Sequence, residues 1–200
     1  MRTVNKSTIT EAFIEQIPTI KKVTAKNITE EIFSFVRDEL CDGKRFPIPL
    51  LGRISVLKKS ERPGCNPKTG EHVVIQPRLS VTLTKNSNVV NKTKTKKSLS
   101  SRLDFYNRLC EKFNITMIEA KKIHKVFIGF MQMTSNAEVR IEIRGFGVFS
   151  GKVRKAMKAK NPKTGAPVDV PPTTRLHFKE SKTLRLYLEN SGNFGVFNNA

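Results

Sequence analysis

The sequence predicts an α+β fold built from two tandem units, each with two helices at its start, a small antiparallel sheet and a protruding β-ribbon arm. Three observations support this prediction. The pentapeptide Asn-Pro-Lys-Thr-Gly occurs at residues 66–70 and again at 161–165, an offset of 95 residues. A β-branched run ending at a proline follows each copy, at residues 73–77 and 168–171. Well before each copy, apolar residues recur three or four apart, which is typical of an amphipathic helix. A repeat of this kind indicates a duplication.

The first unit begins with two predicted helices. Thr8 and Glu11 have the spacing of a capping box, which predicts the start of the first helix, and Pro18 predicts its end. The second helix is long and carries its apolar residues on one face, and Gly43 is placed to end it. The apolar residues on that face are Ala25, Ile28, Ile32, Phe35, Val36 and Leu40.

The second unit repeats this order. Ser101 with Asp104, and then Thr116 with Glu119, predict the starts of its two helices. A short apolar-periodic helix follows the arm at residues 184–188, and the first unit has no evident counterpart. We therefore divide the chain into a first unit at residues 1–85, a basic linker at 86–98, a second unit at 99–190 and a C-terminal tail at 191–200.

Charge is the strongest compositional feature. The 200 residues contain 37 Lys and Arg against 17 Asp and Glu, a formal net charge of +20. Such an excess predicts a polyanionic partner, with nucleic acid favoured over an acidic protein surface. With 38% hydrophobic residues the chain can form a core, and no apolar run is long enough to span a membrane.

The sequence carries no pattern of a catalytic or metal site. The three histidines lie far from one another, and the three cysteines (Cys41, Cys65 and Cys110) are too scattered for a disulfide framework and fit a reducing environment. Paired carboxylates, a nucleophile elbow and a phosphate-binding loop are missing as well. We therefore expect no enzymatic activity, no cofactor and no metal.

The segment around each pentapeptide predicts a cationic β-ribbon. Asn and Gly tolerate positive φ and Pro fixes its own, so the pentapeptide favours a tight turn. Residues 151–163 hold six Lys and Arg, no acid and few large hydrophobic residues, so this hairpin has little to bury. Phosphate is the natural complement of such a ribbon. A proline at its tip is a rigid wedge of the kind that enters between base steps from the minor groove.

These features resemble the bacterial family of HU and integration host factor. The resemblance rests on Gly145-Phe146-Gly147, the basic ribbon and the Asn-Pro-x-Thr-Gly turn, and it covers residues 5–84 and 100–190. It implies a helical dimer body and two arms that embrace double-stranded DNA from the minor groove with weak sequence preference. One chain carries both halves, so the sequence allows an intrachain pseudo-dimer and equally allows pairing between chains into a homo-oligomer.

The resemblance and the charge pattern together predict the DNA-binding residues. Pro67 and Pro162 match the intercalating prolines of the two arms. The complete predicted set is Lys58, Lys59, Arg62, Asn66, Pro67, Lys68 and Arg78 in the first unit, and Lys152, Arg154, Lys155, Lys158, Lys160, Asn161, Pro162, Lys163, Lys179, Lys182 and Arg185 in the second.

The first unit departs further from the family pattern than the second. Three arm positions that the family tends to fill with cations read Lys59, Arg62 and Cys65 in the first arm. The second arm has Arg154, Met157 and Lys160 there, so each arm lacks one cation. The first unit also has residues 50–52, Leu-Leu-Gly, where the second has Gly-Phe-Gly. We interpret the second unit as competent for DNA and the first as partly released from that constraint.

These departures leave an alternative function open. HU-like folds are reused in neck or tail rings of tailed phages, including crAss-like ones, and the chain's richness in Lys, Asn, Ile and Phe suits such a genome. The tail at 191–200 carries Phe194 and Phe197, which suggest docking onto a partner. The leading expectation is an architectural DNA-binding protein of the bacterial cytoplasm, at the nucleoid. The alternative is a structural protein of a phage virion that contacts other virion proteins.

Overall fold

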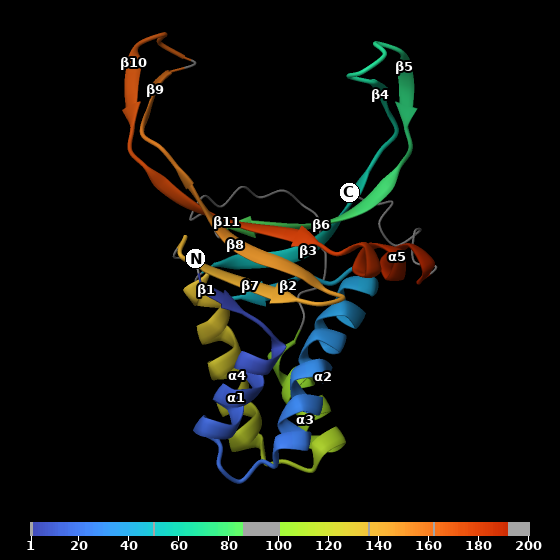
Figure 1. Cartoon of the computed structure of the whole chain (residues 1–200), viewed down its shortest axis with the longest axis vertical. Coiled ribbons are helices and arrows are strands. Elements are labelled where there is room, and N and C mark those ends of the chain that lie inside the picture. The colour runs from blue at the N-terminus through green and yellow to red at the C-terminus, as the bar shows by residue number, and fades with distance from the viewer. Residues whose placement is uncertain (1, 50, 86–100, 136, 162, 192–200) are drawn as a thin grey trace.

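The computed structural model describes residues 2–49, 51–85, 101–135, 137–161 and 163–191. Helices form one end of the molecule, two sheets lie across its middle, and two β-ribbon arms project from the sheets at the opposite end (Figure 1). The predicted α+β class with two similar units is confirmed. The predicted linker at 86–98 and all of the tail after Ser191 lie outside the described residues.

The first unit starts with α1 (Lys6–Gln16) and α2 (Lys22–Cys41). The predicted start at Thr8 is wrong: Asn5 is the N-cap, and its side-chain oxygen accepts a hydrogen bond from the Thr8 amide at 3.0 Å. The helix ends just before Pro18, as predicted. Gly43 ends α2 with a φ of 72°, its amide donating to the Leu40 carbonyl and the Lys44 amide to that of Glu39, the pattern of a Schellman motif.

The second unit starts with α3 (Arg102–Phe113) and α4 (Met117–Met133) and ends with α5 (Lys182–Asn190). Ser101 is the N-cap of α3, and Thr116 with Glu119 forms a complete capping box at α4, so both predicted starts are confirmed. In α5 only Leu184 and Leu188 are buried, whereas Leu186 is 46% exposed. The core-facing stripe of this helix therefore has a spacing of four residues.

Each unit contributes one sheet to the middle layer. In the second, β7 (Val139–Ile143), β8 (Gly147–Arg154) and β11 (Thr173–Glu180) form antiparallel pairs. In the first, β2 (Phe46–Ile48), β3 (Gly52–Lys59) and β6 (Arg78–Lys85) do the same. The arms carry β4 (Arg62–Cys65) with β5 (His72–Ile75), and β9 (Met157–Lys160) with β10 (Pro167–Val170).

The two units are interlocked within the chain. The sequence did not predict β1 (Arg2–Val4), which belongs to the first unit but pairs in parallel with β7 of the second. In return, α5 of the second unit packs on β6 and α2 of the first. Phe33 of α2 contacts Phe127 and Phe146 of the other unit, with ring centroids 5.7 and 5.3 Å apart. The units thus share one hydrophobic core, as the intrachain pseudo-dimer interpretation requires.

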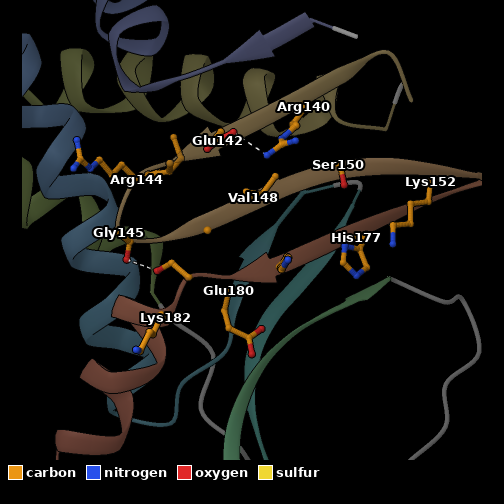
Figure 2. A pocket seen from close by; sticks show the side chains of 14 residues that line it. Arg140, Glu142, Arg144, Gly145, Val148, Ser150, Lys152, His177, Glu180 and Lys182 are labelled. Carbon is orange, nitrogen blue, oxygen red and sulfur yellow. Dashed lines mark hydrogen bonds and ion pairs between the residues drawn. The ribbon is translucent and has the colours of Figure 1, made fainter. Parts of the chain in front are cut away.

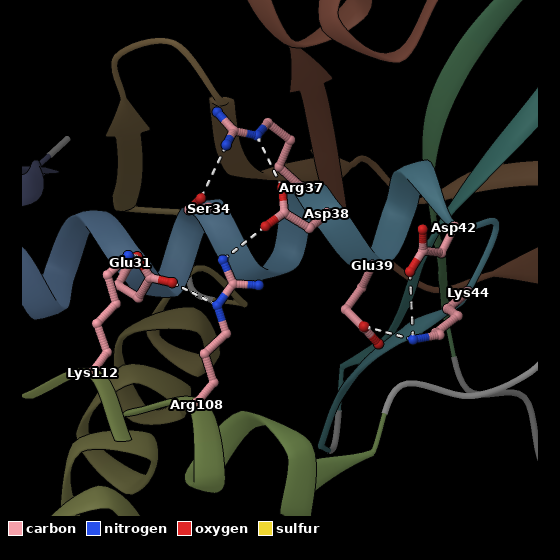
Figure 3. Close-up of polar contacts among 9 residues, drawn as sticks. All are labelled: Glu31, Ser34, Arg37, Asp38, Glu39, Asp42, Lys44, Arg108 and Lys112. Carbon is pink, nitrogen blue, oxygen red and sulfur yellow. Dashed lines mark hydrogen bonds and ion pairs between the residues drawn. The ribbon is translucent and has the colours of Figure 1, made fainter. Parts of the chain in front are cut away.

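Ion pairs join α2 of the first unit to α3 of the second (Figure 3). Arg108 donates through Nε to Glu31 Oε1 at 2.6 Å and through Nη2 to Asp38 Oδ2 at 2.8 Å. Lys112 Nζ donates to the other oxygen of Glu31 at 2.5 Å. The Glu31 side chain is only 7% exposed. Both of its carboxylate oxygens are paired with cations of the other unit. This cluster orients one unit against the other.

Two further results concern the described residues alone. None of the helices in that part of the chain combines the length and the apolar character that crossing a membrane requires. No group of three His, Cys, Asp or Glu side chains suited to a metal ion occurs there either. Among the cysteines, Cys41 is buried, Cys110 is partly buried and Cys65, on the first arm, is exposed.

Candidate nucleic-acid interface

The two arm tips have the same backbone geometry. In the first, the Gly70 amide donates to the Asn66 carbonyl at 2.8 Å and the Lys68 amide donates to Asn66 Oδ1 at 3.0 Å. In the second, the corresponding distances, between Gly165 and Asn161 and between Lys163 and Asn161, are 2.8 and 2.9 Å. Both glycines have positive φ, 74° and 69°. The pentapeptide thus sets the turn in both arms, because Asn accepts two backbone amides and Gly supplies the left-handed conformation.

Pro67 at the first tip is exposed, whereas Pro162 at the second lies outside the described residues. Asn66 and Asn161 are half-buried because their side chains close the turns. Both arms project away from the sheets and from the helical body (Figure 1). An exposed proline at the end of a rigid turn is placed to contact a partner first.

The second arm is the more strongly charged of the two. Its predicted cations are all exposed, and none forms an ion pair within the described part of the chain. They are Arg154, Lys155, Lys158, Lys160 and Lys163. In the first arm Arg62 and Lys68 are exposed, Arg78 is exposed opposite a half-buried Lys59, and Lys58 is half-buried. The first arm also holds the acids Glu61 and Glu71, whereas the second holds Asp169, opposite Lys158, so the net charge of the first arm is lower.

The basic surface of the second arm continues down the outer face of its sheet (Figure 2). Lys152 pairs in register with Arg175, Ser150 with His177 and Val148 with Lys179, so these side chains share one face. Partial burial, followed by the positive charges of Lys152 and Lys179, lowers the pKa of His177. The ring lies between two cations, which disfavour its protonated form.

The Gly-Phe-Gly turn fixes the position of α5 at the end of this face. The Ser181 hydroxyl donates to the Gly145 carbonyl at 2.7 Å and accepts the Leu184 amide at 3.0 Å, which caps the helix. Gly147 has a φ of 155°, and a Cβ there would lie 2.5 Å from the Lys179 carbonyl oxygen. This packing leaves Lys182 exposed at the start of α5, beside the hollow in the sheet.

The structure separates the predicted residues into groups. Among the described residues of the second unit, Lys152, Lys179 and Lys182 line one hollow below the arm. Arg185 is partly buried and bonded to Glu180 at 3.3 Å. Sequence reasoning missed Arg175, which lies opposite Lys152, and Arg140, which is paired with Glu142 at 2.8 Å on the same face. The signal was present for Arg175: residues 173–179 are a strand in which the odd positions share its side.

Comparisons with known proteins agree with this geometry. A family model described as bacterial DNA-binding protein matches residues 4–94 and 100–189. Integration host factor subunit alpha of Neisseria meningitidis serogroup C is 35% identical over 80 residues, which cover 40% of this chain and 80% of the relative. The same subunit from Marinomonas is 37% identical over 82 residues, 41% of this chain and 83% of the relative.

A solved structure is also similar. The chain matches an Anabaena HU–DNA cocrystal structure with 22% identity and a TM-score of 0.39, over 46% of this chain and 99% of that one. Neither the family match nor the integration host factor relatives support the alternative role in a phage virion.

Proposed function

Because the chain belongs to the bacterial DNA-binding protein family of HU and integration host factor, we propose that it is a non-enzymatic architectural protein that bends duplex DNA. Its two arms grip the phosphate backbone and follow the minor groove. Sequence preference is weak, because backbone charge and the deformability of the duplex dominate this mode of binding. The protein acts at the nucleoid of a bacterial cell.

The unpaired cations of the second arm carry this proposal. Exposed Lys and Arg side chains without acidic partners are costly to bring together unless a polyanion compensates them. Lys158, Lys160 and Lys163 lie on a ribbon that buries almost nothing of its own. A phosphate backbone supplies negative charge along a line, which matches a linear array of cations on a β-ribbon.

The tip prolines account for the bending of the duplex in this proposal. Pro67 is exposed beyond the last hydrogen-bonded pair of its arm, and the identical pentapeptide gives Pro162 the same sequence context. A wedge of this kind unstacks a base step at a cost of about a few kcal/mol, and the contacts of the bent duplex offset that cost. The charge and the wedge make separable contributions.

The salt dependence of DNA binding tests the contribution of the arm cations. We expect affinity for linear duplex DNA to fall steeply with salt, with a log–log slope of about −0.9 for each phosphate neutralised. Fluorescence anisotropy over a range of salt concentrations measures the slope. No binding at low salt, or a slope near zero, would reject the proposal.

A second measurement tests the wedge. Pro67→Ala together with Pro162→Ala should reduce the bend angle, measured by energy transfer between the duplex ends, more than it reduces affinity. Pro63→Ala is the matched control, because Pro63 is exposed on the same arm but lies within β4, away from the tip. An unchanged bend angle removes the wedge and leaves the charge argument standing.

A further inference from the structure

The outer faces of the two sheets correspond in register but differ in chemistry. Counting from Gly147 and Gly52, which begin equivalent strands, the pair Lys152–Arg175 of the second sheet corresponds to Leu57–Ser80 of the first. The pair Val148–Lys179 corresponds to Arg53–Thr84. At the first of these positions the second sheet presents two cations, and the first sheet presents an apolar and a hydroxyl side chain. At the other position each sheet presents one cation, Lys179 in the second and Arg53 in the first.

The cations of the second face are available for a ligand. Lys152, Arg175 and Lys179 are exposed, and none is ion-paired within the described ranges. Two of them act together on one group, since Lys152 and Lys179 both lower the pKa of His177. On the first face, Leu57 is 43% exposed and Ser80 is only 9% exposed, so its centre carries no charge, and Arg53 is an exposed cation at the end away from the arm.

The outer face of each sheet begins at the base of the arm that the same strands carry. Strands β8 and β11 carry the second arm, β3 and β6 carry the first, and the arms diverge above the two sheets (Figure 1). A duplex gripped between the arms and bent toward the body leaves in two directions, one half over each sheet. The half over the second sheet meets Lys152 and Lys179, Arg175 opposite Lys152, and then Lys182 at the start of α5. Figure 2 shows Lys152 and Lys182 at the two ends of this hollow.

Resting on the proposed function, we propose that the chain is a one-sided clamp: the outer face of β8 and β11 binds the phosphates of one half of the duplex tightly, while the outer face of β3 and β6, with Arg53 as its cation beyond the base of the arm, holds the other half only weakly. The fusion of two units makes this possible, because a dimer of identical subunits presents two identical faces. The bound duplex then has one tightly held half and one loosely held half that another protein can reach.

Truncated duplexes test this with the protein as it exists. A central nick lowers the cost of bending at that point and so fixes where the arms bind. Three nicked duplexes are compared: one with long flanks on both sides, one with a single long flank, and one with both flanks cut back to the region that the arms hold. Because the protein can bind in either orientation, losing one flank should weaken affinity by only about twofold.

Losing both flanks should have a much larger effect. Affinity should fall by about tenfold or more, and the salt slope should shrink by up to about 3.6, from the four phosphate contacts of Lys152, Arg175, Lys179 and Lys182. A protein that held both halves equally would lose the same factor at each truncation. That stepwise loss would overturn the one-sided clamp while leaving the proposed function intact, whereas failure to bind any of the duplexes would overturn both.

Variants of the two faces give an independent readout. A triple variant should bind all three duplexes with similar affinity. It combines Lys152→Ala, Arg175→Ala and Lys179→Ala. Leu57→Lys with Thr84→Lys should create a dependence on flanks on the other side, so that each flank then contributes, and Leu57→Gln with Thr84→Gln is the uncharged control. If the lysine and glutamine pairs respond alike to truncation, the first sheet lies out of reach of DNA and the charge difference is not the cause.

Discussion

The two units share a backbone but not a surface, and the contrast shows which residues the fold requires. The arm tips agree within 0.1 Å in their turn hydrogen bonds, because Asn, Pro and Gly are tied to the backbone conformation. The exposed cations differ freely, since exposed side chains contribute little to stability. Conformation is therefore retained in both units, while charge is concentrated in the second.

The interior shows the same specialisation. The fifth residue of the first helix bonds the eighth residue of the second in both units, but the pair is Thr10 with Thr29 in one and Tyr106 with His124 in the other. The ionic contacts of Glu31 with Arg108 and Lys112 join α2 to α3. The equivalent positions on α1 and α4 hold Ala12, Gln16 and Val126, which cannot form them. The two units are therefore complementary partners rather than interchangeable copies.

We expect the largest effect from removing the arm cations, because the two arms differ most in their charge. Replacing Lys155, Lys158, Lys160 and Lys163 by alanine should lower the salt slope of DNA binding by up to about 3.6, at about 0.9 per phosphate contact. Replacing Arg62 and Lys68 in the first arm should lower it by only about 1.8. Anisotropy titrations at several salt concentrations measure both.

Circular dichroism of each arm variant controls for folding, which exposed lysines on a ribbon should not affect. Equal changes in slope for the two arms would contradict the specialisation of the second unit.

The interface between the units offers a test of intermediate size. Glu31→Ala should lower the free energy of unfolding by about 2 kcal/mol, because two charge-assisted hydrogen bonds to a nearly buried carboxylate are lost. Glu30→Ala is the control: it is the neighbouring residue on α2, exposed and outside the ion-pair cluster. Urea denaturation measures both, and similar losses would mean that the cluster contributes no more than surface charge.

The sequence predicted what is local and missed what is long-range. The helices, the caps at Ser101 and Thr116 and the pentapeptide turn follow from neighbouring residues, so periodicity and spacing were sufficient. Glu31 and Arg108 lie 77 residues apart, and no local pattern pairs them. The strand β1 has three residues and pairs with the other unit, so its own sequence carried too little signal.

The candidate site divides in the same way. Arm cations were identifiable because they cluster along the chain, and the resemblance gave a role to the tips. Arg175 was missed because its neighbour Lys152 lies across the sheet, 23 positions earlier. At the first helix, the spacing of Thr8 and Glu11 predicted the wrong cap, because the choice of Asn5 depends on a side-chain geometry that the spacing does not contain.

The smallest predicted effect is a pH dependence of stability. It distinguishes the Tyr106–His124 pair of the second unit from the Thr10–Thr29 pair of the first. Burial, followed by the charge of Arg102, lowers the pKa of His124 from 6.5 to about 4. Between these values the unfolded chain binds a proton that the folded chain does not, so the free energy of unfolding should fall as pH drops from 6.5 toward 4 and then level off. We expect a loss of about 1–2 kcal/mol, less than the full shift implies, because the ring is only partly buried.

His124→Gln should remove most of this dependence, since an amide can still accept the Tyr106 hydroxyl but does not titrate in this range. The Thr10–Thr29 pair of the first unit has no titrating group. The equivalent position in that unit therefore contributes no pH dependence to the free energy of unfolding. Urea denaturation at pH 7 and pH 4.5 compares the variant with the unchanged chain, and His177→Gln is the control for a histidine on the sheet face. If His124→Gln leaves the pH dependence as it was, the proton uptake lies elsewhere, and the two interior pairs are equivalent in spite of their different chemistry.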